Sequence, residues 1–194
     1  MHHLIVYAHP NPASFNFAIR ERVISVLKQK GQSVRLRDLY ALRYDPVLQG
    51  DELEGLQQGR VSRDTAIEQE HVRWADVLIF IYPLWWAGMP AIARGYIDRV
   101  FSKGFAYDYG AEGLKGLLSG KRVQLINTMG APLAAYETSG ILKSMEQLTD
   151  QETFRFCGME VIGHHYFGSV PTVTQEERVK MLDEVARIAA ALPA

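Results

Sequence analysis

The sequence predicts an α/β fold in which a five-stranded parallel sheet lies between two layers of helices. Short apolar runs alternate along the chain with longer amphipathic segments, and this strand–helix repetition is typical of parallel sheets covered on both faces. Residues 77–81 are apolar throughout, as expected of a strand that is buried on both sides. The 194 residues contain no repeat or linker, so we expect one domain, residues 1–194.

Five segments are predicted to be strands, namely residues 4–8, 33–39, 77–81, 123–127 and 161–167. The alternation of Val34 and Leu36 with arginines places the second strand near an edge. A first helix is expected to begin at Ser14 or Asn16 and to end near Lys30. Later helices are expected over residues 63–74, 90–101, 141–150 and 175–192, and residues 44–59 are expected to form a loop with one helical turn.

Composition excludes several classes of function. The formal net charge is −1, so no excess of positive charge indicates binding to nucleic acid or to an anionic membrane. Cys157 is the only cysteine, which rules out an internal disulfide and agrees with a reducing cytoplasm. The N-terminus has neither a basic segment nor a long apolar core, so we expect a cytoplasmic protein. His164 and His165 are adjacent in a predicted strand and would point to opposite faces, so no metal site is expected.

The candidate site follows from the predicted sheet. Ligands of open α/β sheets bind beyond the carboxyl ends of the strands, near the point where the strand order reverses. We therefore expect the functional residues directly after Ala8, Tyr82 and Asn127.

The first of these loops joins a strand to a helix and contains His9, Ser14 and Asn16. The free N–H groups and positive dipole of a helix N-terminus bind phosphate, and these side chains add donors. A role as a simple helix cap is equally favoured for Ser14 or Asn16. The chain has neither a Gly-x-Gly-x-x-Gly motif nor a Walker lysine here, which disfavours an ordinary dinucleotide site and an NTPase.

The second and third loops have unusual residues at the same predicted edge. Trp85 and Trp86 are adjacent after the most apolar strand, where planar rings are suited to a planar ligand, although core packing is the simpler interpretation of either tryptophan alone. Thr128 and Gly130 follow the fourth strand and offer a hydroxyl and close backbone approach, although an ordinary turn also explains them. Their shared location, rather than any single motif, indicates a binding site.

Four segments together resemble the NAD(P)H:quinone oxidoreductase, or DT-diaphorase-like, family, whose fold is flavodoxin-like. The family includes bacterial quinone reductases and the flavoprotein partners of potassium-efflux systems. The similarity runs over nearly the whole chain, and the segments that carry it are residues 8–16, 83–91, 99–107 and 156–158.

The resemblance implies a site for each part of a bound flavin. The residues that it places at the phosphate region are His9, Ser14, Phe15 and Asn16. Those that it places along the isoalloxazine ring are Pro83, Leu84, Trp85, Trp86, Ala87, Asn127, Thr128, Met129 and Gly130. Tyr136 would lie beside the pyrimidine edge, where its hydroxyl and the backbone N–H groups of Met129 and Gly130 would stabilise negative charge on the reduced flavin. Similar proteins are homodimers with the pocket at the interface, so Tyr107, Tyr109 and Phe156 are expected to line the pocket of the neighbouring subunit.

The implied reaction passes hydride from NAD(P)H through bound FAD, with FMN as the alternative, to a quinone or a similar small acceptor. Three residues depart from the family pattern. Met129 stands where the mammalian enzymes have glycine, Leu142 replaces the histidine that partners the family tyrosine, and Ala13 replaces a threonine that contacts phosphate.

Two other functions agree with the same motifs. The first alternative is a regulatory flavoprotein that binds a potassium-efflux transporter, with its reductase activity secondary. The second alternative is a one-electron carrier like flavodoxin, which we rank last because flavodoxins are usually much more acidic.

Overall fold

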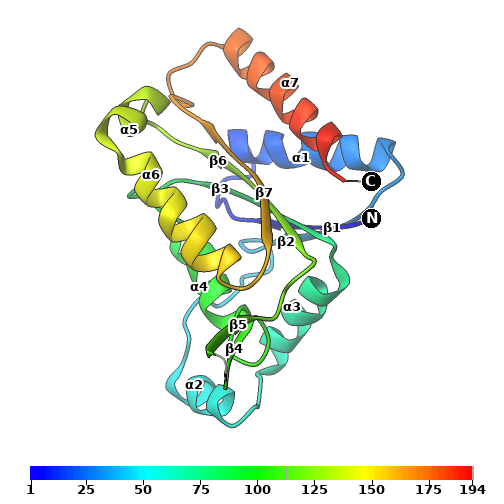
Figure 1. Cartoon of the computed structure of the whole chain (residues 1–194). Helices are drawn as coiled ribbons and strands as arrows, with labels where there is room; N and C mark the ends of the chain where they lie inside the picture. Colours follow the sequence, from blue (N-terminus) through cyan, green and yellow to red (C-terminus); the bar gives the residue numbers. More distant parts are fainter. Residues whose placement is uncertain (112, 194) are drawn as a thin grey trace.

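The computed structural model describes residues 1–111 and 113–193, and a five-stranded parallel sheet lies at its centre (Figure 1). The strand order is β2-β1-β3-β6-β7. The strands are β1 (His2–Tyr7), β2 (Ser33–Asp38), β3 (Val77–Pro83), β6 (Arg122–Thr128) and β7 (Glu160–Phe167). The predicted parallel sheet is confirmed, and so is the position of β2 at an edge.

Helices cover both faces of this sheet, as predicted. On one face α1 (Phe15–Gln29) packs beside α7 (Gln175–Ala191), and their apolar side chains form one core with the sheet. On the other face α3 (Arg63–Trp74) and α4 (Ala91–Val100) form a second core. Figure 1 shows these layers, with α1 and α7 above the sheet and α3 and α4 below it. The sequence pattern therefore located all four of these helices to within two residues at most ends.

The connection between β6 and β7 is more elaborate than the single predicted helix over residues 141–150. Helix α5 (Leu133–Ser139) comes first and ends at Gly140, whose φ of 76° is left-handed. Helix α6 (Ile141–Glu146) follows and continues into η1 (Gln147–Arg155), a stretch with the wider turns of a π-helix. Stretches of π-helix are rare and are frequently found at functional sites.

Two further elements differ from the sequence-based expectation. The segment expected to be a loop with one turn contains the eight-residue helix α2 (Gly50–Gln57). Arg99 of α4 holds this segment in place, since its guanidinium donates to Glu52 at 2.8 Å, to Asp64 at 2.7 Å and to the Asp45 carbonyl at 2.6 Å. The antiparallel hairpin of β4 (Tyr107–Gly110) and β5 (Gly113–Gly116) was not predicted, because its glycine-rich strands lack an apolar alternation.

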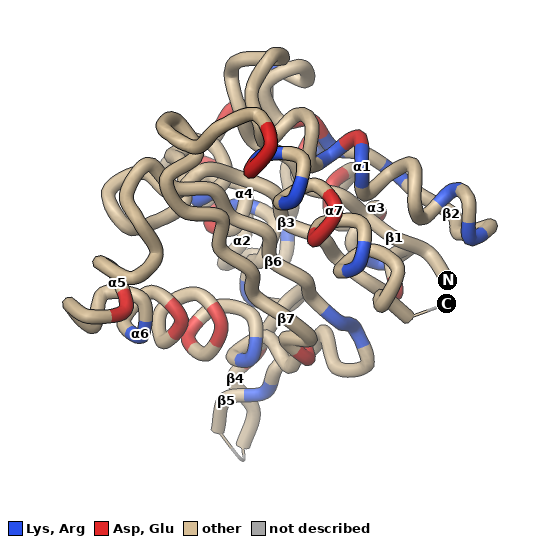
Figure 2. The backbone as a smooth tube through the Cα atoms, turned by 90° about the horizontal axis from the view of Figure 1, so that it is seen from above, with Lys and Arg blue, Asp and Glu red and all other residues tan. Residues whose placement is uncertain are grey.

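Charged residues of both signs are interspersed along the chain rather than gathered on one face (Figure 2). This distribution agrees with the net charge of −1. None of the described helices is both long enough and apolar enough to cross a membrane.

Candidate functional site

A pocket of about 330 Å³ lies at the carboxyl end of the sheet, where the strand order reverses between β1 and β3. All three loops that the sequence singled out contribute to its wall. A fourth loop, between β7 and α7, was not anticipated. The residues that line the pocket are His9, Ser14, Phe15, Asn16, Pro83, Leu84, Trp85, Thr128, Met129, Gly130, Val170 and Pro171.

Ser14 begins helix α1 at the floor of the first loop. Its Oγ accepts the Phe17 N–H at 3.1 Å, so the cap interpretation is correct, and Ser14 also lines the pocket. The Tyr7 hydroxyl lies 3.3 Å from the same oxygen. His9 Nδ1 lies 3.0 Å from the Asn11 backbone nitrogen and 3.2 Å from the Asn11 carbonyl oxygen, so its ring is held against the backbone of this loop. Burial lowers the pKa of the imidazole.

Asn16 is the buried polar residue of the pocket. Its side-chain N–H donates to the Thr128 Oγ at 2.7 Å, and the two residues are 3% and 4% exposed. Its Oδ1 is buried and has no partner among the described residues. A buried acceptor without a donor is costly and uncommon. The hydroxyl or amide of a bound ligand would supply the missing donor.

The second loop is a tight turn in an unusual conformation. The Trp85 and Gly88 backbones exchange two hydrogen bonds of 3.1 Å, and the two residues between them have left-handed φ values, 54° at Trp86 and 58° at Ala87. Such turns normally contain asparagine or glycine. The Trp86 and Ala87 amides have no backbone acceptor among the described residues, so both are available to a ligand.

The two tryptophans of this turn have different surroundings. Trp86 has a relative exposure of 102% and buries no surface in the single chain, so core packing does not explain it. Trp85 is 43% exposed, and its ring lies 6.4 Å from the His9 ring at an angle of 60°. Its full exposure and the left-handed φ values of this turn make Trp86 a candidate contact for a ligand or a second chain.

The third loop corrects one expectation. The Met129 N–H donates to the Phe167 carbonyl at 2.9 Å, so it is not available to stabilise a ligand's negative charge. The neighbouring Gly130 N–H has no backbone acceptor among the described residues and remains the available donor. Met129 itself is 3% exposed and packs into the floor of the pocket.

The remaining predicted residues lie apart from this pocket. Tyr136 is half-buried on α5, and Asn127 is buried behind the pocket wall; neither is among its lining residues. Tyr107 packs against Tyr109 with ring centroids 6.0 Å apart, and against Phe156 at 5.2 Å. This aromatic group belongs to the hairpin region, at the lower end of Figure 1, whereas α5 is at the upper left. A single chain therefore does not join the group to the pocket.

Sequence reasoning missed two parts of this region. The first is the wall made by Val170 and Pro171, although a Gly-Ser-Val-Pro segment after the last strand was a usable signal at the same edge. The second is a buried chain of hydrogen bonds from Asn127 through His164 to Asp150. Among the described residues, no three His, Cys, Asp or Glu side chains converge as metal ligands.

The comparisons with known proteins agree with this architecture. A family model described as flavodoxin-like fold matches residues 1–189. The chain belongs to this flavodoxin-like family. It is 36% identical over 188 residues to an uncharacterized NAD(P)H oxidoreductase of Haemophilus influenzae, covering 96% of this chain and 93% of that protein.

More distant members of the family have names that specify the acceptor. The rat NAD(P)H dehydrogenase [quinone] 1 is 32% identical, and the alignment covers 93% of this chain and 73% of the rat protein. The solved NAD(P)H:quinone oxidoreductase of Methanothermobacter marburgensis superposes with a TM-score of 0.89 at 26% identity, covering 100% of this chain and 99% of that one. The family resemblance inferred from the motifs is thereby confirmed.

Proposed function

We propose that this flavodoxin-like protein is a flavin-dependent NAD(P)H oxidoreductase that reduces a quinone or a similar electrophile. Its NAD(P)H oxidoreductase and quinone reductase relatives support this activity. The observation that carries the proposal is a set of unpaired groups in the pocket and on the turn beside it. In the pocket these are the buried Oδ1 of Asn16 and the Gly130 amide. On the turn they are the amides of Trp86 and Ala87, which follow Trp85 of the pocket wall but do not line the pocket themselves.

These groups fit the chemistry of a flavin. The N-terminus of α1, with its Ser14 cap, offers backbone donors to a phosphate. The Asn16 Oδ1 would accept a hydrogen bond from a ribityl hydroxyl and would then no longer be unpaired. The amides of Trp86 and Ala87 are suited to the polar edge of the ring, and the Gly130 amide to the end that becomes negative on reduction. When bound, the flavin supplies the redox chemistry by accepting hydride from NAD(P)H and passing it on.

FAD is the proposed flavin and FMN the alternative, because both would place a phosphate at the same helix N-terminus. The proposed location is the reducing cytoplasm, in agreement with the single cysteine. Tyr136 stays a proposed site residue, acting through its hydroxyl beside the ring. Its helix, α5, directly follows the loop that contains Gly130.

We further propose that a second copy of the chain completes the pocket. Among the described residues, the large aromatic side chains that one chain leaves most exposed are Trp86, Tyr109 and Trp85, with relative exposures of 102%, 63% and 43%. A homodimer would bring Tyr107, Tyr109 and Phe156 of one subunit to the pocket of the other. Burial of such aromatic residues is typical of protein interfaces.

The test begins with the visible spectrum of the purified protein. Bands of oxidised flavin that bleach on anaerobic titration with NADPH or NADH, and return when a quinone is added, would support the proposal. Identification of the released flavin distinguishes FAD from FMN, and sedimentation gives the oligomeric state. A protein that takes up neither flavin, even after reconstitution, would refute the proposed function.

A further inference from the structure

A cavity of about 390 Å³ lies between β7 and α7, on the face of the sheet that α1 and α7 cover. It shares no lining residue with the candidate flavin pocket. Its volume falls within the range of small-molecule sites, roughly 300–1,000 Å³. Apolar side chains from β7 and the end of α7 form one part of its wall, and four polar side chains complete it, namely Gln124, His165, Glu184 and Arg187. The proposed function uses none of these four residues.

Gln124 is a polar residue in an apolar part of the sheet. It is 3% exposed, and the residues beside it on the same face, Ile126 of β6 and Ile162 of β7, are apolar. One side-chain N–H of Gln124 donates to the Leu125 carbonyl at 3.2 Å. The second N–H and the Oε1 have no partner among the described residues, and the side chain lines the cavity. A buried amide with a free donor and a free acceptor indicates that polar groups of another molecule reach it.

The backbone of β7 makes room for this amide. Next to the Gln124–Gly163 pair, β7 contains one more residue than β6, which makes Ile162 a β-bulge. A methyl group on Gly163 would lie 2.8 Å from Gln124 Oε1 and 3.0 Å from His165 Nε2. Both atoms border the same position above Gly163, so one small ligand can reach both. Bulges and glycines within strands weaken the sheet locally, and they are frequent where a ligand approaches the backbone.

His165 presents a second polar edge to the cavity. It points to the α7 side of β7, whereas the adjacent His164 points to the other side, where it pairs with Asp150. Within the part of the chain that the structure describes, neither ring nitrogen of His165 has a hydrogen-bond partner. Burial lowers the pKa of the His165 imidazole, so near neutral pH the ring is uncharged and offers one donor and one acceptor.

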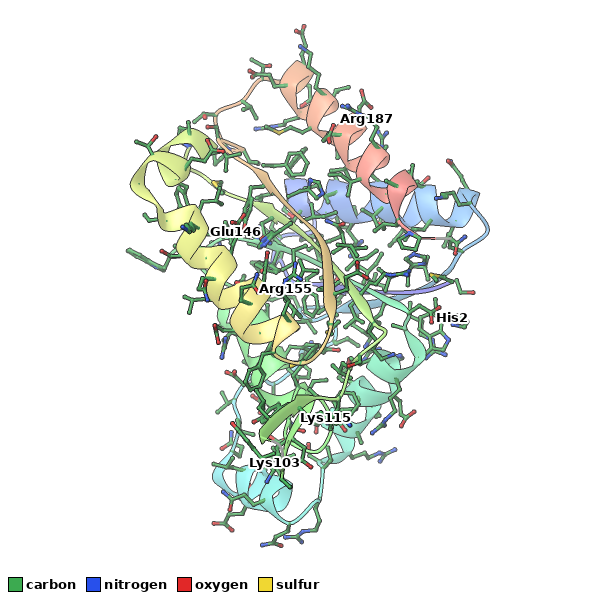
Figure 3. The ribbon with its side chains drawn as sticks, viewed as in Figure 1. His2, Lys103, Lys115, Glu146, Arg155 and Arg187 are labelled. Carbon is green, nitrogen blue, oxygen red and sulfur yellow. The ribbon has the colours of Figure 1, made fainter. Side chains whose placement is uncertain are left out.

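The charged side chains of the cavity neutralise each other. The Arg187 guanidinium lies 2.6 Å from the Glu184 carboxylate, and these side chains are 73% and 42% exposed. Figure 3 shows Arg187 on α7, on the opposite side of β7 from Glu146 of α6. The Arg187–Glu184 pair leaves no net charge to attract an anion or a cation, so the cavity favours an uncharged ligand.

We propose that this cavity is a second ligand site, which binds a small uncharged ring whose edge presents an N–H beside a C=O, as a pyrimidine base does. The N–H of the ring would donate to Gln124 Oε1, and its carbonyl would accept from the free N–H of the same amide. His165 would bind the next polar group of the ring, and Ile162 and Ile188 would contact its faces. This inference goes beyond the proposed function and does not depend on it, because the cavity is separate from the flavin pocket.

The test is an NMR titration of the ¹⁵N-labelled wild-type protein, as purified, with uracil. We expect the backbone signals of Gly163, His165 and Ile188 and the side-chain signal of Gln124 to shift, with a dissociation constant of about 1 mM or below. The matched control ligand is 1,3-dimethyluracil, because it keeps the ring and both carbonyls but has no N–H donor. It is expected to bind at least about tenfold more weakly than uracil.

Two variants test the polar side chains separately. Gln124→Leu removes the amide and keeps a side chain of similar size, and His165→Phe removes both ring nitrogens. Each variant should bind uracil about tenfold more weakly than the wild type. Gln175→Leu makes the same chemical change at an exposed position of α7 and should stay within about twofold of the wild type.

Three results would overturn the inference. They are the absence of shifts at about 10 mM uracil, equal affinity for uracil and 1,3-dimethyluracil, and shifts confined to flavin-pocket residues such as Thr128 and Gly130. The two ligands are compared on the wild-type protein, so this result does not depend on the folding of a variant. The titration needs no flavin, so its failure leaves the proposed function standing. A wild-type protein that binds neither FAD nor FMN would overturn the proposed function, and the uracil titration would still decide the second site.

Discussion

The double variant Asn16→Leu/Thr128→Val is expected to keep the stability of the flavin-free protein while it weakens flavin binding. In the flavin-free protein these side chains share one buried hydrogen bond of 2.7 Å, and the Asn16 Oδ1 is unpaired. Removing both partners eliminates that unpaired acceptor, so the free energy of unfolding should stay within about 1 kcal/mol of the wild type. The single change Thr128→Val leaves the buried Asn16 side-chain N–H without an acceptor and should lower the free energy of unfolding by about 1–3 kcal/mol.

Flavin binding by the double variant, unlike its stability, should be clearly weakened. The double variant loses two polar groups of the pocket wall, each worth roughly 1 kcal/mol to a bound ligand, so the dissociation constant should rise about 10- to 100-fold. Urea unfolding of the flavin-free protein measures the stability, and quenching of flavin fluorescence measures the affinity. Ser25→Ala, an exposed change on the same helix, is the control for both. An unchanged flavin affinity in the double variant, or a loss of stability above about 2 kcal/mol, would refute the reasoning.

Three further predictions concern other parts of the molecule. Arg99→Met should lower the free energy of unfolding by about 3–5 kcal/mol, because it leaves the Glu52 carboxylate buried without its cation. Burial alone would raise the pKa of Glu52, but hydrogen bonds from Arg99, Ser62 and Thr65 hold it below its ordinary value. The stability contributed by Glu52 is therefore present above its unfolded pKa and lost as pH falls through the folded pKa, so urea unfolding should show a smaller difference between wild type and variant at acidic pH. Trp86→Ala should change the free energy of unfolding of the isolated subunit by less than about 0.5 kcal/mol, because the side chain is exposed, but should weaken dimerisation in sedimentation or raise the KM for the quinone. Tyr136→Phe should modestly lower the rate constant for flavin reduction in stopped-flow measurements, and an unchanged rate constant would show that its hydroxyl has no such role.

The edge of the sheet at which the candidate site lies was predictable because it depends on local sequence pattern. Apolar runs such as residues 77–81 identify strands, and the loops that follow parallel strands meet at one edge whatever the details of packing. The helix cap at Ser14 is similarly local, since its hydroxyl bonds a backbone amide three residues away. These features depend on interactions between residues that are close together in the sequence, so the sequence pattern reveals them.

The elements that were missed or misjudged depend on distant partners. Helix α2 is held by Arg99, which is 47 residues from Glu52, and no local pattern in residues 44–59 reveals that contact. The hairpin has little apolar alternation of its own, and Tyr107 packs against Phe156 from a remote part of the chain. Tertiary contacts outweigh weak local propensity in such segments.

The sequence by itself determined the parallel sheet, the layers of helices and the edge at which the loops gather, because periodicity and chain connectivity leave few other arrangements. Only the tertiary structure decided which groups at that edge are free. It pairs the Met129 amide with Phe167 and leaves that of Gly130 available, and it brings Asp150 to His164 across 14 residues. Whether a polar group is free depends on every partner within about 3 Å, and those partners come from strands and helices that meet only in the folded chain.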